Sequence, residues 1–266
     1  MADNERIPAV AGAFYAGDQQ GLAREVGDLL AQAPETAAPP PKALIAPHAG
    51  FMFSGPTAAR AYARLAGAEA TIERVVLLGP SHHVPFRGLA ASSAEAFVTP
   101  LGTVPVDAQA MAEALALPGV AVLDSAHARE HSLETQLPFL QRVLGDFHLV
   151  PLAVGDSSPE EVGRVLETLW GGPETLIVIS SDLSHFHDDA TARRLDRTTA
   201  QAIEDLRTED LGHDNACGFH PVRGLLWVAR RRGGRVTTLD LRNSSDAGAP
   251  RDRVVGYGAF ALEESA

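Results

Sequence analysis

The sequence has little of several residue types, and each shortage excludes a class of chemistry. Cys217 is the only cysteine, so no disulfide can form within the chain. Lys42 is the only lysine and follows three prolines. This excludes a GxxxxGK[ST] phosphate-binding loop and argues against a lysine Schiff base.

Long apolar runs are also missing. No stretch approaches the roughly 18 to 20 apolar residues that a membrane-spanning helix needs. The first residues, MADNERIPAV, are charged and lack the apolar segment of a secretory signal. These features predict a cytoplasmic protein without a membrane segment.

Positive charge is scarce. The chain has 22 Lys and Arg against 34 Asp and Glu, which gives a formal net charge of −12 at pH 7. Proteins bind a phosphate backbone through clustered Lys and Arg, so we expect no nucleic-acid partner. Hydrophobic residues make up 45% of the chain and charged residues 21%, which is the balance of a folded globular protein.

Short apolar runs alternate with amphipathic helical patterns. This alternation indicates an α/β fold, with a mostly parallel or mixed central sheet flanked by helices on both faces. We expect a single domain over residues 1–266, with a Pro-rich surface connector near 33–41. The patterns predict strands at 43–46, 75–78, 120–123, 147–154, 176–179, 236–241 and 254–262, and helices at 19–32, 57–66, 107–117, 133–144, 159–170, 190–206 and 222–231.

Histidines follow the carboxyl ends of three predicted strands. His48 follows the first, His82 and His83 follow the second, and His185 follows the strand at 176–179. In open α/β sheets, ligands bind at the carboxyl ends of the strands. We therefore predict a metal site or an acid–base cluster there. Adjacent residues of an extended segment point to opposite sides, and we choose His82, which is nearer the strand, as the one that faces the site.

Two further signals are open to more than one interpretation. Cys217 precedes a predicted helix, where it is either a small buried side chain or a metal ligand. His127, Glu130 and His131 match the H-x-x-E-H pattern of some zinc proteases. That pattern needs both histidines on one helix face, whereas the predicted helix begins only at about 133, so a zinc hydrolase is the weaker hypothesis.

Six ordered motifs together resemble the Memo family, whose bacterial and archaeal branch is called AmmeMemoRadiSam system protein B. The matches run in order from Arg6 to the C-terminal strand around Tyr257 and cover nearly the whole chain. The motifs are RIPAVAGAFY from Arg6, APHAGF from Ala46, LGPSHH from Leu78, EHSLE from Glu130, SSDLSH from Ser180 and CGFHP from Cys217.

The resemblance implies a fold similar to that of class III extradiol dioxygenases, which are non-haem iron enzymes. It also implies a metal site of two His and one Cys, which on this sequence are His48, His82 and Cys217. Iron or copper is the expected metal, and zinc is compatible with these ligands. A Cys in place of the dioxygenase carboxylate ligand puts ring cleavage in doubt.

Further pocket residues implied by the resemblance are His131, Asp182 and His185, which we expect to act in acid–base catalysis. If the strands that end at His48 and His82 are neighbours, they lie about 4.8 Å apart, and two imidazoles can share an ion. The N-terminal dipole of the following helix is expected to favour the Cys217 thiolate.

Two functions of different classes follow from the resemblance. The first is a metal-dependent oxidoreductase whose substrate the sequence does not identify. The second is a metal-binding protein without turnover, which acts as a scaffold or as a partner of a radical-SAM protein and an AMMECR-type protein.

Overall fold

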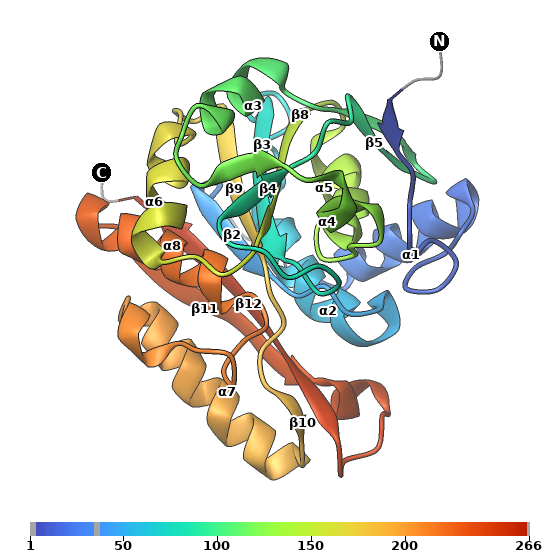
Figure 1. Cartoon of the computed structure of the whole chain (residues 1–266). Helices are drawn as coiled ribbons and strands as arrows, with labels where there is room; N and C mark the ends of the chain where they lie inside the picture. The colour runs from blue at the N-terminus through green and yellow to red at the C-terminus, as the bar shows by residue number, and fades with distance from the viewer. Residues whose placement is uncertain (1–3, 35–37, 265–266) are drawn as a thin grey trace.

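The computed structural model describes residues 4–34 and 38–264 and is built around one mixed sheet (Figure 1). Within these residues the sheet has nine strands, in the order β10-β12-β2-β9-β3-β8-β4-β7, with β11 paired to β12. The strands are β2 (Ala43–Ala46), β3 (Arg74–Pro80), β4 (Leu89–Ala91), β7 (Val120–Val122), β8 (His148–Val154), β9 (Thr175–Ser180), β10 (His185–His187), β11 (Arg235–Asn243) and β12 (Val254–Glu263).

Four central strands, β2, β9, β3 and β8, are parallel to one another. Antiparallel pairs stand on both sides of them, with β12 against β2 and β4 against β8. The predicted α/β class with a mostly parallel or mixed sheet is therefore confirmed. The more specific likeness to a dioxygenase fold remains a prediction from the family resemblance.

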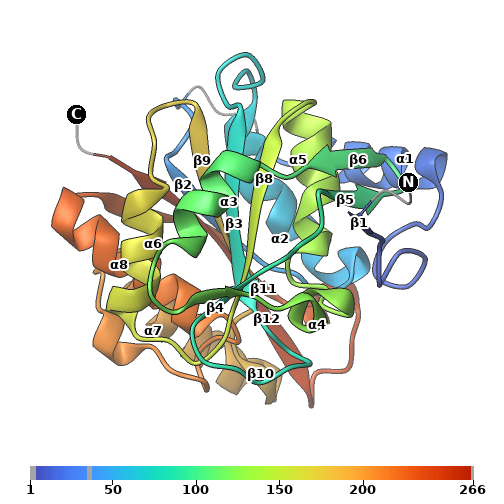
Figure 2. The same ribbon diagram turned by 45° about the horizontal axis from the view of Figure 1, so that its top comes forward.

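Helices cover both faces of the sheet (Figures 1 and 2). Because successive side chains of a strand point to opposite faces, alternate residues of each central strand belong to two different cores. Val76 and Leu78 face the core under α3 (Ala108–Leu115), α6 (Pro159–Thr168), α7 (Asp189–Glu204) and α8 (Phe219–Arg232). Val75 and Leu77 face the core under α1 (Gln19–Ala31), α2 (Phe51–Tyr62) and α5 (Leu137–Leu144).

The prediction missed several short elements. The strands β5 (Ala96–Thr99) and β6 (Gly102–Pro105) form a separate small sheet with β1 (Glu5–Arg6). The short helix α4 (Asp124–Ala128) and the strands β4 and β10 were also not expected. Elements of two to five residues carry too few periods to show in a pattern, and β1 pairs with a strand some ninety positions away.

Helix α2 begins at Phe51, six residues before the predicted start, and continues through Gly55 and Pro56. Tertiary packing accounts for the earlier start, because the buried side chain of Phe51 packs near Tyr15 and Phe139 and stabilises the first turn.

The predicted connector at 33–41 contains no helix or strand in the part that the structure describes; residues 35–37 lie outside the described residues. A search of the described helices finds none with the length and hydropathy that a bilayer crossing requires.

Candidate metal centre

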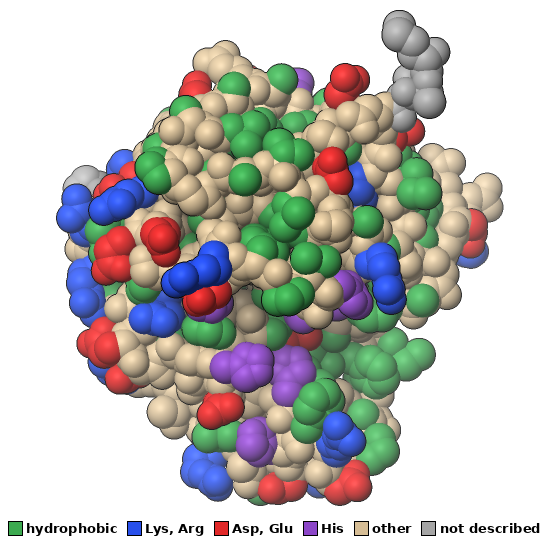
Figure 3. Space-filling model, viewed as in Figure 1, with side chains coloured by type: hydrophobic (Ala, Val, Ile, Leu, Met, Phe, Trp, Pro, Cys, Tyr) green, Lys and Arg blue, Asp and Glu red, His purple; other side chains and the backbone are tan. Residues whose placement is uncertain are grey.

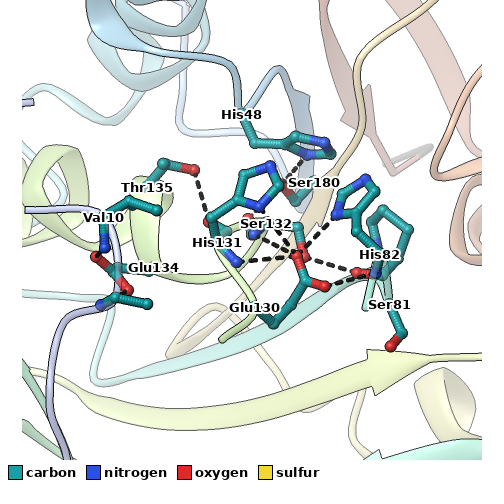
Figure 4. A network of polar contacts seen from close by, with 12 residues as sticks. Val10, His48, Ser81, His82, Glu130, His131, Ser132, Glu134, Thr135 and Ser180 are labelled. Carbon is teal, nitrogen blue, oxygen red and sulfur yellow. Dashed lines mark hydrogen bonds and ion pairs between the residues drawn. The ribbon is translucent and has the colours of Figure 1, made fainter. Parts of the chain in front are cut away.

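Three histidines from separate loops meet at the carboxyl edge of the sheet (Figure 4). His48 follows β2, His82 follows β3, and His131 lies in the loop after α4. One ring nitrogen of each lies within 4.8 Å of those of the other two. The ring centroids of His48 and His82 are 5.1 Å apart. Among the described residues, this cluster has the geometry of a candidate metal site.

The condition that β2 and β3 are neighbouring strands is not met, because β9 lies between them. Two strand spacings correspond to about 9.6 Å, so the imidazoles must lean toward each other across the end of β9. Strand order cannot be read from the spacing of motifs along a chain, which is why the sequence could not show this.

Glu130 fixes the orientation of His82 and the path of the loop that carries His131. Its buried carboxylate accepts hydrogen bonds from the backbone N–H of His82 (2.6 Å), His131 (2.9 Å) and Ser132 (2.9 Å). It also contacts His82 Nδ1 at 2.8 Å (Figure 4). The Nδ1–carboxylate contact leaves His82 Nε2 available to a metal ion, an arrangement common in metal sites.

His48 is held in the same way by the end of β9. Its Nδ1 lies 2.8 Å from Ser180 Oγ, and its backbone N–H donates to Asp182 Oδ1 at 2.7 Å. Its Nε2 is therefore left to face the cluster. In the sequence, Ser180 and Glu130 stand out only as members of motifs, and nothing there predicts that either orients a histidine.

Cys217 lies beside His48, just before α8, with its Sγ 3.3 Å from His48 Nε2. The Asp182 N–H donates to the same sulfur at 3.3 Å. Burial of this sulfur and the nearby Asp182 carboxylate raise the pKa of the Cys217 thiol well above its ordinary value. The stabilisation of the thiolate that was expected from the helix dipole is thus outweighed here, and only a close cation would favour the thiolate.

The other predicted residues lie around the cluster at different depths. Asp182 is buried with Oδ2 4.0 Å from His48 Nε2, whereas His185 contacts its own loop through Nδ1 and the Leu183 carbonyl oxygen (2.8 Å). His83 is exposed, with its ring centroid 6.3 Å from that of His131. His127 is buried elsewhere, with Nε2 2.9 Å from the Ala90 carbonyl oxygen.

Helix α4 contains His127 but ends before His131, so the H-x-x-E-H residues do not share one helix face. Glu130 contacts His82 and His131, and His127 is not a member of the histidine cluster. This geometry argues against the zinc-protease interpretation.

The electrostatics of the site favour a neutral imidazole at His48 and His131. Burial, together with the neighbouring His82, holds the pKa of His48 well below its ordinary value. Burial and the adjacent His48 and His82 lower the pKa of His131 to about 4. Burial alone would lower the pKa of His82, but the hydrogen bond and charge of Glu130 raise it. Because a metal ion binds the neutral ring, this donor set fits a transition metal.

On the molecular surface, several histidine side chains gather on one face, between the main body and the part built from α7 and β10 (Figure 3). His48 is 2% exposed, while His82 is exposed, so the cluster is accessible from one side. A small molecule can therefore approach the ring nitrogens from outside.

Comparison with known proteins gives consistent results. A family model described as "Memo-like protein" matches residues 6–261. A "MEMO1 family protein" of Aquifex aeolicus is 36% identical over 263 residues, covering 95% of this chain and 97% of that protein. A protein with the same description from Methanosarcina mazei is 33% identical, covering 97% and 99% of the two chains.

A solved structure of an uncharacterized protein from Escherichia coli K12 matches with a TM-score of 0.50 and 16% identity. The match covers 80% of this chain and 98% of the other. At this identity it supports the α/β fold alone.

Proposed function

This chain belongs to the Memo family, and we propose that it is a metal-dependent oxidoreductase that uses iron or copper at the histidine cluster. The observation that carries the proposal is the convergence of His48, His82 and His131 within 4.8 Å, with the Cys217 thiol beside His48. Imidazole and thiolate donors suit iron, copper and zinc. The lone cysteine is consistent with a reducing, cytoplasmic compartment.

His48 and His82 form the centre of the proposed ligand set. His131 completes the histidine cluster, and Cys217, whose Sγ lies 3.3 Å from His48 Nε2, is a further candidate donor. A bound redox metal would supply electron transfer and activation of oxygen at the positions that the protein leaves open. Glu130 and Ser180 hold the two central rings through Nδ1, so that Nε2 points into the site. Asp182 and His185 are the groups that we expect to exchange protons with a substrate.

Elemental analysis of protein purified without added metal tests the proposal directly. We expect close to one iron or copper per chain, lost in the His48→Ala and His82→Ala variants. His83→Ala is a matched control, because this exposed histidine neighbours His82, and His127→Ala tests the zinc-hydrolase alternative. We expect both controls to keep the metal. Cys217→Ser and His131→Ala then establish which donor completes the ligand set.

Turnover is tested separately. Protein loaded with Fe(II) under anaerobic conditions is exposed to oxygen with a set of small phenols or a reductant, and oxygen consumption is recorded. Consumption that depends on His48 supports the oxidoreductase. Metal binding without any consumption would instead favour a non-catalytic metal protein, and metal retained in both His48→Ala and His82→Ala would refute the site.

A further inference from the structure

We propose that the N-terminal segment Arg6–Tyr15, here called the N-terminal clip, positions the histidine cluster by tying together the two loops that carry His48 and His131. This inference rests on the proposed metal function. It assigns a positioning role to residues far from the metal ligands in sequence.

The clip is anchored by Glu134, which is fully buried four residues after Glu130. Its carboxylate pairs with the Arg6 guanidinium and accepts the backbone N–H groups of Ala9 (2.7 Å) and Val10 (3.0 Å). The Tyr15 hydroxyl donates to the same carboxylate at 2.6 Å. One carboxylate therefore fixes both ends and the middle of the clip. Figure 4 shows its contact with Val10.

Arg6 links this anchor to the His131 loop. Its guanidinium also donates to the backbone carbonyl oxygens of His127 (3.1 Å) and Glu130. These two carbonyls mark the beginning and the end of the turn that delivers Glu130 and His131. Because Arg6 is only 7% exposed, water has little access to replace it as a partner of these carbonyls, and its loss would free the turn.

Phe14 contacts both halves of the site. Its ring lies edge-on to His131, with the centroids 4.9 Å apart. Its carbonyl oxygen accepts the Phe51 N–H at 2.7 Å, at the start of α2 and three residues after His48. The same residue therefore supports the His131 ring and the His48 loop, and the clip forms one wall of the site.

The contacts of the clip do not resemble simple core packing. Glu134 and Arg6 form a buried ion pair, which is costly to desolvate and contributes more to geometry than to net stability. Partners that orient metal ligands typically change metal affinity about 10- to 100-fold when removed. We therefore expect clip variants to change metal binding by more than their effect on stability explains.

The test uses the full chain with Co(II) alone as the probe, at a temperature where all variants are folded. Arg6→Gln should weaken Co(II) binding, measured by competition with a chelator, about 10- to 100-fold and change the visible absorption of the bound ion. Arg6→Lys should recover part of the Co(II) affinity and part of the wild-type absorption spectrum. Phe14→Ala, which leaves the buried ion pair intact, should also weaken binding.

Arg74→Gln is the matched control, because the Arg74–Asp107 pair (2.7 Å) lies at the other end of β3 from His82. We expect it to lower the melting temperature and leave Co(II) affinity within about twofold of the wild type. If Arg6→Gln and Phe14→Ala lower only the melting temperature and bind Co(II) as tightly as the wild type does, the positioning role is refuted.

Amide hydrogen exchange separates this inference from the proposed function. Arg6→Gln should accelerate exchange at His131, Ser132 and Thr135, whereas Arg74→Gln should not. If the wild type binds no metal, the proposed function fails, yet this exchange pattern would still support the clip. Unchanged exchange in that segment would overturn the clip whether or not metal binds.

Discussion

Replacing Glu130 by Gln is the most informative single substitution at the site. The Glu130 Oε1 atom faces His82 Nδ1 and the N–H groups of His131 and Ser132, and Oε2 accepts the His82 N–H at 2.6 Å. Glutamine has the same shape but carries an NH2 group in place of one oxygen. That group would meet a backbone donor, so at least one buried N–H loses its partner.

The expected cost follows from this geometry. A hydrogen bond to a charged group contributes about 1.5–3 kcal/mol, and an unpaired buried donor costs about 1–3 kcal/mol more. The remaining bonds to Gln are weaker because the charge is gone. We therefore expect Glu130→Gln to lower the free energy of unfolding by about 3–5 kcal/mol, and metal affinity by about 10- to 100-fold.

Urea unfolding at pH 7 measures the stability change. Glu161→Gln is a suitable control, because Glu161 accepts the Ser158 N–H in an exposed capping box and its loss should cost below about 1 kcal/mol. A Glu130→Gln variant within about 0.5 kcal/mol of the wild type would refute the argument that this carboxylate organises the loop.

The same substitution should change acid unfolding. Burial alone would raise the pKa of Glu130, but the hydrogen bond and charge of His82 and the backbone N–H groups hold it well below its ordinary 4.5. The folded protein therefore binds this proton less readily than the unfolded chain does. The stabilisation is fully present above pH 4.5 and is lost as the pH falls below it, so Glu130→Gln should unfold less steeply in acid.

Two further predictions concern other parts of the fold. Burial raises the pKa of the Asp196 carboxyl from 3.8 to about 6, so the unfolded chain releases this proton first as the pH rises. The free energy of unfolding should therefore fall by about 3 kcal/mol as the pH rises from about 4 to 6. Asp196→Asn keeps an acceptor for the Ser184 N–H. The free energy of unfolding of the variant minus that of the wild type, measured by urea titration, should be more favourable to the variant at pH 8 than at pH 4. An equal difference at both pH values would contradict this. A methyl group at Gly163 would lie 2.4 Å from Trp227 Cε3. Gly163→Ala should therefore push α6 away from α8 and lower the free energy of unfolding by about 1–3 kcal/mol. A melting temperature equal to that of the wild type would contradict the close packing.

Much of the central architecture could be predicted from local patterns. The strands β2, β8 and β9 are continuous apolar runs, and their positions agree with the prediction to within one residue. The helix at 19–32 was also predicted, and Asp18 caps the N-terminus of α1 by accepting the Gly21 N–H at 2.9 Å. These features depend on neighbouring residues, which is the information that a single sequence carries best.

The elements that were missed depend on distant partners. The short strands β5 and β6 are paired into a sheet whose third member is β1. His131 does not follow a strand, and its position depends on Glu130, Arg6 and Phe14. The family resemblance placed His131 in the pocket, but its membership of the three-histidine cluster could be learned only from the fold.

The position of β9 accounts for the number of groups that hold the histidines. His48 and His82 come from strands separated by β9, and a ring that leans across a third strand has many competing orientations. Ser180 and Asp182, at the end of β9, restrain His48, and Glu130 restrains His82 from the opposite loop. The strand that separates the two histidines thus supplies the partners that bring one of them into the cluster. The site therefore depends on Ser180 of β9 and on Asp182 just after it, which we do not place in the central ligand set.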